Sequence, residues 1–150
     1  MGGQSLVFRA DTHLAAIGLE QVTEVLRPLP VEALAGVPPY VKGICVLRGQ
    51  PVPVIDIGLL LGGRRASGGA HAANWAERFV GVRTGTQTAV LAVDTVLGIR
   101  DIPMERLHDL SSVTGSAACT AVGAIGREPL LLLEAGRVIP DSVWDALEAA

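Results

Sequence analysis

The 150-residue sequence predicts an all-β fold with only short helices. Turn-forming residues recur about every 8 to 12 positions, and the segments between them are short apolar runs. Aromatic residues make up only 3% of the chain, so Val, Leu, Ile and Ala must build the core, and Val and Ile favour strands. This succession of hairpins indicates small barrels rather than a parallel sheet with crossover helices, although composition alone does not separate a barrel from a sandwich.

The N-terminal part alternates apolar runs with turn residues, which is the pattern of paired strands. Pro28 and Pro30 end this part, because proline supplies no backbone N–H to continue a ladder or a helix. In order, we expect a strand at 6–8, a turn at 11–13, a strand at 14–18, a helical turn at 19–22 and an extended segment at 24–27.

The stretch from Pro38 to Asp56 predicts a further β-hairpin. Apolar residues fill its first arm from Val41 to Leu47, Arg48-Gly49-Gln50 supplies a tight turn, and β-branched residues then resume. Pro51 and Pro53 cannot donate to a ladder, so we expect this second arm at a sheet edge or with a bulge.

Downstream of this hairpin, glycine and proline divide the chain into short elements. Residues 62–74 are mostly Gly, Ala, Ser, Arg and His without periodicity, which predicts a flexible loop. In order, we expect a helical turn at 57–61, the loop at 62–74, strands at 79–83, 88–93 and 96–101, a helix start at 103–107, a loop at 111–118, strands at 121–125 and 130–133 that are buried on both faces, and a C-terminal helix at 142–148 with Asp141 or Ser142 as its N-cap.

Charge and hydropathy exclude several classes of function. The net charge of −3 provides no basic field for a nucleic-acid backbone. No apolar run approaches the roughly 18 residues of a membrane-spanning helix, and the N-terminus lacks the pattern of an export signal. We therefore expect a cytoplasmic protein that binds no nucleic acid and does not insert into membranes. Cys45 and Cys119 have apolar neighbours and no metal or redox spacing, so both are expected to be buried thiols.

The chain carries no recognisable catalytic, metal or cofactor motif. Its histidines have no metal-ligand spacing, its serines lack a nucleophile-elbow context, and no glycine-rich phosphate loop occurs. Asp56 and Asp94 each follow a β-branched run and are better explained as caps at strand ends than as a catalytic pair. We therefore expect no catalytic residue, no metal and no cofactor. Groups that converge only in the folded chain could still form an enzyme.

Motifs spread over nearly the whole chain carry a family resemblance. The 38–56 hairpin contains Pro-x-Tyr-Val-x-Gly, Leu-Arg-Gly and Pro-Val-Ile-Asp, and it is flanked by Ile17-Gly18, Val22-Thr23-Glu24-Val25, Ala92-Val93-Asp94 and Val122-Gly123-Ala124-Ile125-Gly126. In order and spacing these motifs resemble the CheW family of chemotaxis coupling proteins. The chain departs from the family pattern at Val46, where an Asn usually precedes Leu-Arg-Gly.

The resemblance implies one CheW-like domain over residues 1–150, made of two intertwined SH3-like five-stranded barrels with a hydrophobic core between them. It also implies a non-catalytic adaptor that joins the regulatory domain of a CheA-type histidine kinase to the cytoplasmic tip of a chemoreceptor, and that reaches the membrane only through receptor arrays. Such domains also occur in pilus-motility and other kinase pathways, so the pathway stays open. The alternative from another class is a small-molecule-binding or enzymatic β-barrel that uses a cleft between its lobes.

Arg48 and Glu24 are the central candidates for a binding site. From the residues alone, Arg48 is either a solvated turn charge or a guanidinium paired with Glu24. In the second case Val46, Leu47 and Val52 would shield it. The resemblance favours the second reading, because the matching Arg and Glu are associated with receptor binding in the family. The partner-binding candidates are Val22, Glu24, Gly43, Leu47, Arg48, Val96 and Ile99, of which Val96 and Ile99 could equally be core residues and Gly43 could serve close backbone approach.

Overall fold

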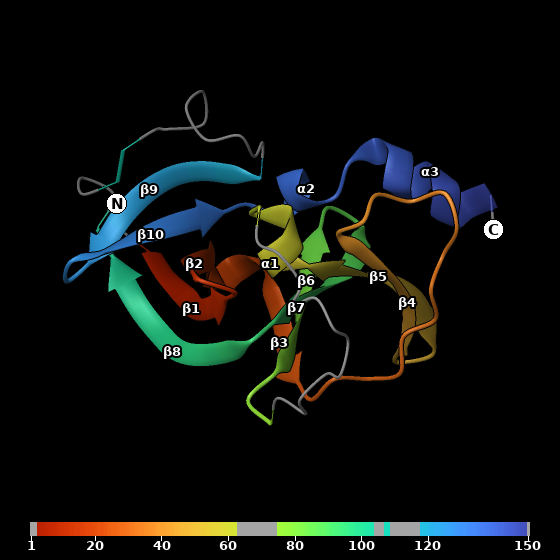
Figure 1. Cartoon of the computed structure of the whole chain (residues 1–150), viewed down its shortest axis with the longest axis horizontal. Coiled ribbons are helices and arrows are strands. Elements are labelled where there is room, and N and C mark those ends of the chain that lie inside the picture. Colours follow the sequence, from red (N-terminus) through yellow and green to blue (C-terminus); the bar gives the residue numbers. More distant parts are fainter. Residues whose placement is uncertain (1–2, 63–74, 104–106, 109–117, 150) are drawn as a thin grey trace.

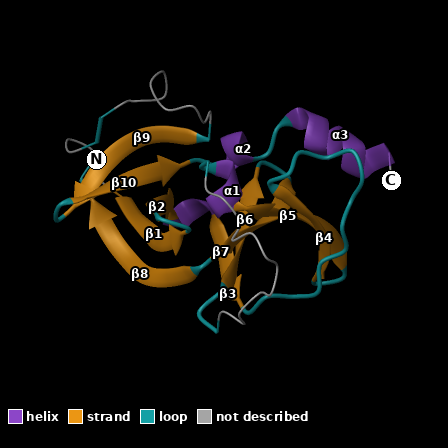
Figure 2. Cartoon of the chain, viewed as in Figure 1, coloured by secondary structure: helices purple, strands orange, loops and turns teal. Residues whose placement is uncertain are grey.

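The computed structural model describes residues 3–62, 75–103, 107–108 and 118–149, and these form two five-stranded sheets with short helices between them (Figures 1 and 2). The strand order is β8-β1-β2-β10-β9 in one sheet and β3-β6-β7-β5-β4 in the other. We call these the first and the second barrel. The predicted all-β class is confirmed. The predictions for the 62–74 loop, the helix start near 103–107 and the 111–118 loop fall largely outside the described residues.

The strands and helices occur in the order that the sequence predicts. In the described residues they are β1 (Gly3–Ala10), β2 (His13–Gly18), the 3-10 helix η1 (Leu19–Gln21), β3 (Val22–Leu26), β4 (Val41–Leu47), β5 (Gln50–Asp56), α1 (Ile57–Leu60), β6 (Arg78–Thr84), β7 (Gln87–Val93), β8 (Thr95–Ile102), β9 (Cys119–Ile125), β10 (Glu128–Leu133), α2 (Ala135–Val138) and α3 (Asp141–Ala149).

The two barrels are intertwined along the chain. β1 and β2 begin the first barrel, β3 to β7 build the whole second barrel, and β8 to β10 return to complete the first (Figure 1). Most neighbouring strands pair antiparallel, but β10 runs parallel to β2 and β5 runs parallel to β7. These two parallel ladders join strands from distant parts of the sequence, so they complete each sheet.

Three clusters of buried side chains form the core. The largest takes residues from both barrels, among them Phe8, Ile17, Ile55 and Leu91. The first barrel has its own cluster of Val7, Leu14, Ala16 and Leu130, and the second has one that includes Cys45, Leu47, Val54 and Phe79. Neighbouring residues of β1 and β2 alternate between the shared cluster and the first barrel's cluster, because side chains of a strand point to opposite faces in turn. Both strands are therefore buried on both faces.

The two aspartates that follow β-branched runs act as caps. Asp56 Oδ1 accepts a hydrogen bond of 3.1 Å from the backbone N–H of Leu59 at the start of α1. Asp94 Oδ2 accepts one of 2.6 Å from the N–H of Asp11 in the β1–β2 turn. Their assignment as caps is thus confirmed. Cys45 and Cys119 are buried, as expected, and neither forms a disulfide. Burial raises the pKa of the Cys45 thiol.

The prediction that the second arm of the 38–56 hairpin lies at a sheet edge is wrong. β5 lies between β4 and β7, and the edge strands of the second barrel are β3 and β4. The ladder with β7 begins only at Val54, beyond Pro51 and Pro53. The prolines are tolerated because this half of β5 pairs with β4 alone.

Two further expectations differ from the structure. β9 and β10 are only partly buried over much of their length, because β9 is an edge strand of the first barrel. Asp141 is already helical and the N–H of Val143 donates to the carbonyl of Pro140, so the predicted N-cap lies one or two residues too late. The inward-facing role of Val143 is confirmed, since its side chain is 1% exposed.

Candidate protein-docking site

A two-residue turn at Arg48 and Gly49 joins β4 to β5. Both residues have positive φ, 53° for Arg48 and 80° for Gly49, which is the geometry of a type I′ turn. Glycine and asparagine adopt this conformation readily, whereas the Cβ of arginine is crowded in it. The chain therefore carries an arginine where the turn itself favours a different residue. That choice indicates that the side chain of Arg48 has a role outside the turn.

Arg48 and Glu24 form an ion pair, as the sequence predicted. Nε of Arg48 donates to Oε2 of Glu24 at 2.8 Å, and this carboxylate raises the pKa of the guanidinium. The pair links the edge strand β3 to the tip of the β4–β5 hairpin. The expected shielding of Arg48 is wrong, because 77% of its side chain is exposed, against 23% for Glu24. A turn position projects into solvent and cannot be covered by its own strands.

The ion pair uses only one of the five N–H donors that a guanidinium carries. The four donors on Nη1 and Nη2 have no partner among the residues that the structure describes. Glu24 restricts the orientation of the planar group through Nε, so these donors remain oriented and unused. A carboxylate from another molecule could accept two of them as a bidentate pair.

A groove of about 330 Å³ surrounds this pair on the second barrel. It is lined by Thr23, Glu24, Leu47, Arg48, Gln50, Val52, Arg83 and Thr88. Arg83 faces Thr88 across the β6–β7 ladder and adds a second cation. The sequence analysis missed Arg83 and Thr88. The only local sequence feature near these two residues is the turn between them. This turn does not show that β6 lies beside β3, which is what places both residues at the groove.

Gly81 allows β3 to lie close to β6 at this groove. A Cβ at position 81 would come within 2.7 Å of Thr23 Oγ1 and 3.3 Å of Glu24 Cγ. The stem of Glu24 therefore lies over a position without a side chain, which places its carboxylate within reach of Arg48.

Exposed aliphatic side chains also lie on the two edge strands of the second barrel, outside the groove lining. Val46, two residues before Arg48 on edge strand β4, is 63% exposed, and Val25, beside Glu24 on edge strand β3, is 43% exposed. Val46 is also the position at which this chain departs from the usual Asn. A hydrogen-bonding residue is thus replaced by an apolar surface. Large aliphatic groups on unpaired strand edges suit contact with another protein.

The remaining candidates on the second barrel have structural explanations. Leu47 is buried in the barrel's cluster and also forms part of the groove wall. Gly43 has a φ of 142°, and a Cβ there would overlap the carbonyl oxygen of Glu32. Glu32 and Ile44 exchange two backbone hydrogen bonds, which brings these segments together. Close backbone approach therefore accounts for Gly43. Val22 packs against the shared core.

Val96 and Ile99 lie on the first barrel, away from the Arg48 groove in the sheet order. Val96 packs against the shared core, whereas Ile99 is 54% exposed. Leu97, which the sequence analysis missed, is also 54% exposed. The pairing with β1 skips Leu97, because Val7 is opposite Gly98 and Phe8 is opposite Val96, so simple strand alternation does not predict its exposure. β8 is an edge strand, so Leu97 and Ile99 form a second exposed apolar surface, the β8 edge.

Within the described ranges, no group of three or more His, Cys, Asp and Glu side chains is placed to hold a metal ion. None of the helices in the same part of the chain has the length and apolar character required to cross a bilayer.

The fold is a two-barrel domain with exposed aliphatic side chains on edge strands of each barrel. The sequence profile of the CheW-like domain matches residues 4–143, and the chain belongs to this family. A solved structure of similar fold is the scaffolding protein TtCheW from Thermoanaerobacter tengcongensis, with a TM-score of 0.77, 21% identity and 92% of each chain covered.

Named relatives agree with this family. Protein FrzA of Myxococcus xanthus is 35% identical over 97 residues, which cover 65% of this chain and 58% of FrzA, so the match spans less than two thirds of that relative. The chemotaxis protein CheW of Rhizobium meliloti is 26% identical over 97% of this chain and 93% of its own length. The chemotaxis protein CheW of Klebsiella aerogenes is 24% identical over 93% of this chain and 82% of its own length.

Proposed function

We propose that this chain is a non-catalytic adaptor that couples chemoreceptors to a CheA-type histidine kinase. Membership of the CheW-like domain family supports this function, as do relatives named as chemotaxis proteins and a structural neighbour named as a scaffolding protein. The adaptor works in the cytoplasm and meets the membrane only through receptor arrays. The similarity to FrzA leaves open which kinase pathway it serves.

One observation carries the proposal: the Arg48 groove and the β8 edge lie on different barrels. The groove belongs to the second barrel and presents an oriented guanidinium, and the exposed Val46 and Val25 lie on the edge strands of the same barrel, outside the groove lining. The β8 edge belongs to the first barrel and presents Leu97 and Ile99. A chain with two separate surfaces can hold two partners at once, whereas a single cleft would serve one ligand.

The chemistry of each surface suggests its partner. A helical receptor tip can place an apolar face on the aliphatic side chains beside the groove while an acidic side chain accepts from the free donors of Arg48. The kinase regulatory domain is itself a β-barrel domain, so it suits the apolar edge strand β8. We therefore assign the receptor to the groove and the kinase to the β8 edge.

Coupling follows from holding both partners together. A bridge that binds each partner modestly raises the local concentration of one beside the other, and avidity can then exceed either affinity about 10²–10⁴-fold. A change in the receptor alters kinase activity when the adaptor contacts the two receptor states differently. The adaptor needs no covalent chemistry for this work.

The test is a pair of substitutions, each of which should weaken the binding of a different partner. Arg48→Glu reverses the charge that the groove presents and should weaken receptor binding about thirtyfold, as expected for loss of a central interface arginine. Kinase binding and the melting temperature should stay close to wild type. Ile99→Asp should instead weaken kinase binding and spare receptor binding. Pull-down of each partner and receptor-dependent kinase activity measure both effects.

The matched control is Arg27→Glu, an equal charge reversal at an exposed arginine that does not line the groove. It should leave both partners bound. If Arg48→Glu folds normally and leaves receptor binding and kinase control unchanged, the assignment of the groove is wrong. If Arg48→Glu and Ile99→Asp both retain both partners, both surface assignments are wrong. If the wild-type chain does not bind the kinase and the receptor, the adaptor proposal itself fails.

A further inference from the structure

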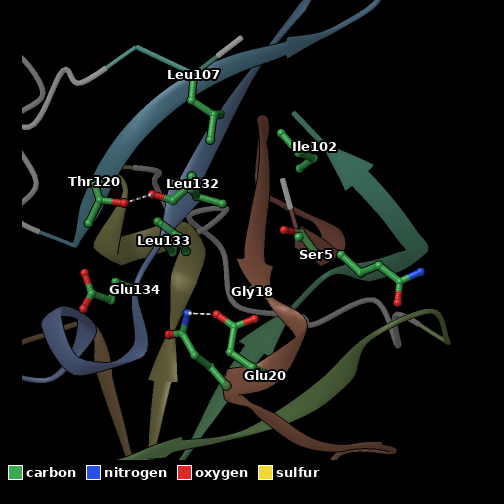
Figure 3. A pocket seen from close by; sticks show the side chains of 12 residues that line it. Ser5, Gly18, Glu20, Ile102, Leu107, Thr120, Leu132, Leu133 and Glu134 are labelled. Carbon is green, nitrogen blue, oxygen red and sulfur yellow. Dashed lines mark hydrogen bonds between the residues drawn. The ribbon is translucent and has the colours of Figure 1, made fainter. Parts of the chain in front are cut away.

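A pocket of about 420 Å³ lies at one end of the first barrel (Figure 3). Its walls come from the N-terminal end of β1, the end of β2, the end of β8 and the facing ends of β9 and β10. None of the predicted partner-binding residues lines it. It is a separate feature from the Arg48 groove.

Small residues leave this end of the barrel unfilled. The β1 row that faces the barrel interior contains Val7, and the β2 row contains Ala16, which is opposite Val7 in the ladder. Two residues further along, the same rows place Ser5 opposite Gly18. Interior positions of a small barrel are normally filled by larger side chains. The pair of Ser5 and Gly18 therefore creates the hollow.

Ser5 contributes a hydroxyl to the pocket. The residue is only 5% exposed and is the one buried polar residue in the described part of the chain. Its hydroxyl makes no hydrogen bond to the described residues, and Figure 3 shows it directed across the pocket toward Leu132 and Leu133. The oxygen is open to the pocket, so a ligand there can reach it.

Glu20 places a carboxylate beside that hydroxyl. A Cβ at position 18 would overlap the carboxylate of Glu20, so the acid is folded back over Gly18, the residue opposite Ser5. Gln21 Nε2 donates to Glu20 Oε1 at 3.4 Å, and no cation pairs with Glu20 in the described residues. Glu134 stands at the rim and already pairs with Arg137 at 3.5 Å. The net charge of the opening is therefore negative.

One side of the pocket is aliphatic. Ile102, Leu107 and Leu132 form this apolar wall, and Ile102 and Leu132 continue into the first barrel's own cluster. The other lining residues include Gln4, Gln21 and Thr120. The apolar wall thus lies in the same pocket as the Glu20 carboxylate and the Ser5 hydroxyl, which belong to neighbouring positions at Gly18. An ammonium group has three donors and no acceptor, so it can serve both oxygens at once.

We propose that this pocket binds an alkylammonium group, with the ammonium held by Glu20 and the Ser5 hydroxyl and the aliphatic stem against Ile102, Leu107 and Leu132. The group is either a free small amine or a lysine side chain of a partner protein. Both sources present an aliphatic stem and the same positive charge.

The test uses n-butylamine, which reproduces the lysine side chain, and 1-butanol as its neutral counterpart. Backbone amide resonances of the full chain are followed by NMR during each titration. Butylamine should shift the amides of Ser5, Gly18 and Glu20 and saturate, and 1-butanol should bind about fivefold or more weakly because it lacks the charge. The result does not depend on a kinase or a receptor, so it is independent of the proposed function.

Variants locate the binding site. Glu20→Gln keeps the shape of the side chain and should weaken butylamine about fivefold, whereas Glu148→Gln, an exposed carboxylate on α3, should have no effect. Ser5→Val fills the hollow and should abolish binding. Ser5→Ala removes the hydroxyl without adding bulk. The affinity of this variant for butylamine is measured as well, so the role of Ser5 can be tested even if Ser5→Val does not fold.

Three results would overturn the proposal. They are unshifted pocket amides in the wild-type chain, equal affinity for butylamine and 1-butanol, and an effect of Glu20→Gln no larger than that of Glu148→Gln. If butylamine binds as expected, saturating amounts of the kinase or receptor fragment identify the source. Displacement of butylamine indicates a partner's lysine, and retained butylamine indicates a free amine.

Discussion

The two barrels each carry an arginine–glutamate pair, and the two pairs are built differently. In the first barrel Arg9 donates through both terminal nitrogens to the two oxygens of Glu128, at 2.7 and 3.0 Å. In the second barrel Arg48 donates once, through Nε, and leaves its terminal nitrogens unused. About a third of the Arg9 side chain is exposed (36%), against 77% for Arg48.

Backbone conformation separates the two arginines as well. Arg9 lies in regular β1, where its side chain reaches across β2 to the start of β10. Arg48 lies in a turn with positive φ, a conformation that disfavours arginine. The first pair therefore serves the fold by joining three strands. The second is held at a local cost in stability and keeps donors for a partner. The predictions below test this difference, from the largest expected effect to the smallest.

Gly43→Ala should give the largest loss of stability. The added Cβ would meet the carbonyl of Glu32 and would also occupy a positive φ, so we expect a loss of about 2 kcal/mol or more in the free energy of unfolding. Gly36→Ala is the control, because it also has a positive φ, of 80°, but no atom lies within 4 Å of the new Cβ. Urea denaturation compares the two. Equal losses would show that close approach at Gly43 is not what requires glycine.

Arg9→Gln should lower the melting temperature by about 2–4 °C, because the bidentate pair that spans three strands is lost. Binding of the receptor and the kinase should not change. The comparison between the two pairs fails if Arg9→Gln melts like the wild type, or if it releases a partner while the fold stays intact.

The first pair should also make stability depend on pH. The hydrogen bonds from Arg9 lower the pKa of Glu128 in the folded chain. A carboxylate with a lowered pKa stabilises the fold fully above its unfolded pKa of about 4.3, and this contribution disappears as the pH falls through the folded pKa. The melting temperatures of wild type and Glu128→Gln should therefore differ most near neutral pH and converge in acid. A constant difference from pH 7 to pH 3 would contradict this cause.

Arg48→Asn should have the smallest effect on stability, and it should raise the stability whereas the preceding substitutions lower it. Asn-Gly is the preferred sequence of a type I′ turn, so the melting temperature should rise by about 1–3 °C even though the pair with Glu24 is lost. Receptor binding should weaken in the same variant. A fall in melting temperature would mean that the Arg48 pair, like the Arg9 pair, stabilises the fold.

Sequence patterns were sufficient for the hairpins, whereas the pairing of Arg48 with Glu24 was favoured over a solvated charge only by the family resemblance. The turns at 11–13, 48–49 and 84–86 are local in chemistry, and strands between them are recognised from their apolar and β-branched residues. The resemblance then indicated the two barrels and the residues of the groove. Arg83 was missed because its place beside β3 depends on a ladder between strands that are far apart in the chain.

The errors have the same origin. Proline in β5 suggested an edge strand, but edge position depends on where the parallel ladder with β7 begins. The expected shielding of Arg48 assumed a strand end, whereas the residue occupies the turn itself. The pocket of the first barrel could not be anticipated, since Ser5 and Glu20 are unremarkable until Gly18 and the ends of β8 and β10 lie around them.

The order of strands and turns, the absence of a basic surface and the arginine at a hairpin tip are properties of neighbouring residues, and the sequence alone determined them. Which strands became edges, which aliphatic side chains stayed in solvent and where the first barrel remained hollow were decided only by the tertiary structure. The physical reason is that these features depend on contacts across the two parallel ladders and the shared core, whose partners are separated by long stretches of chain.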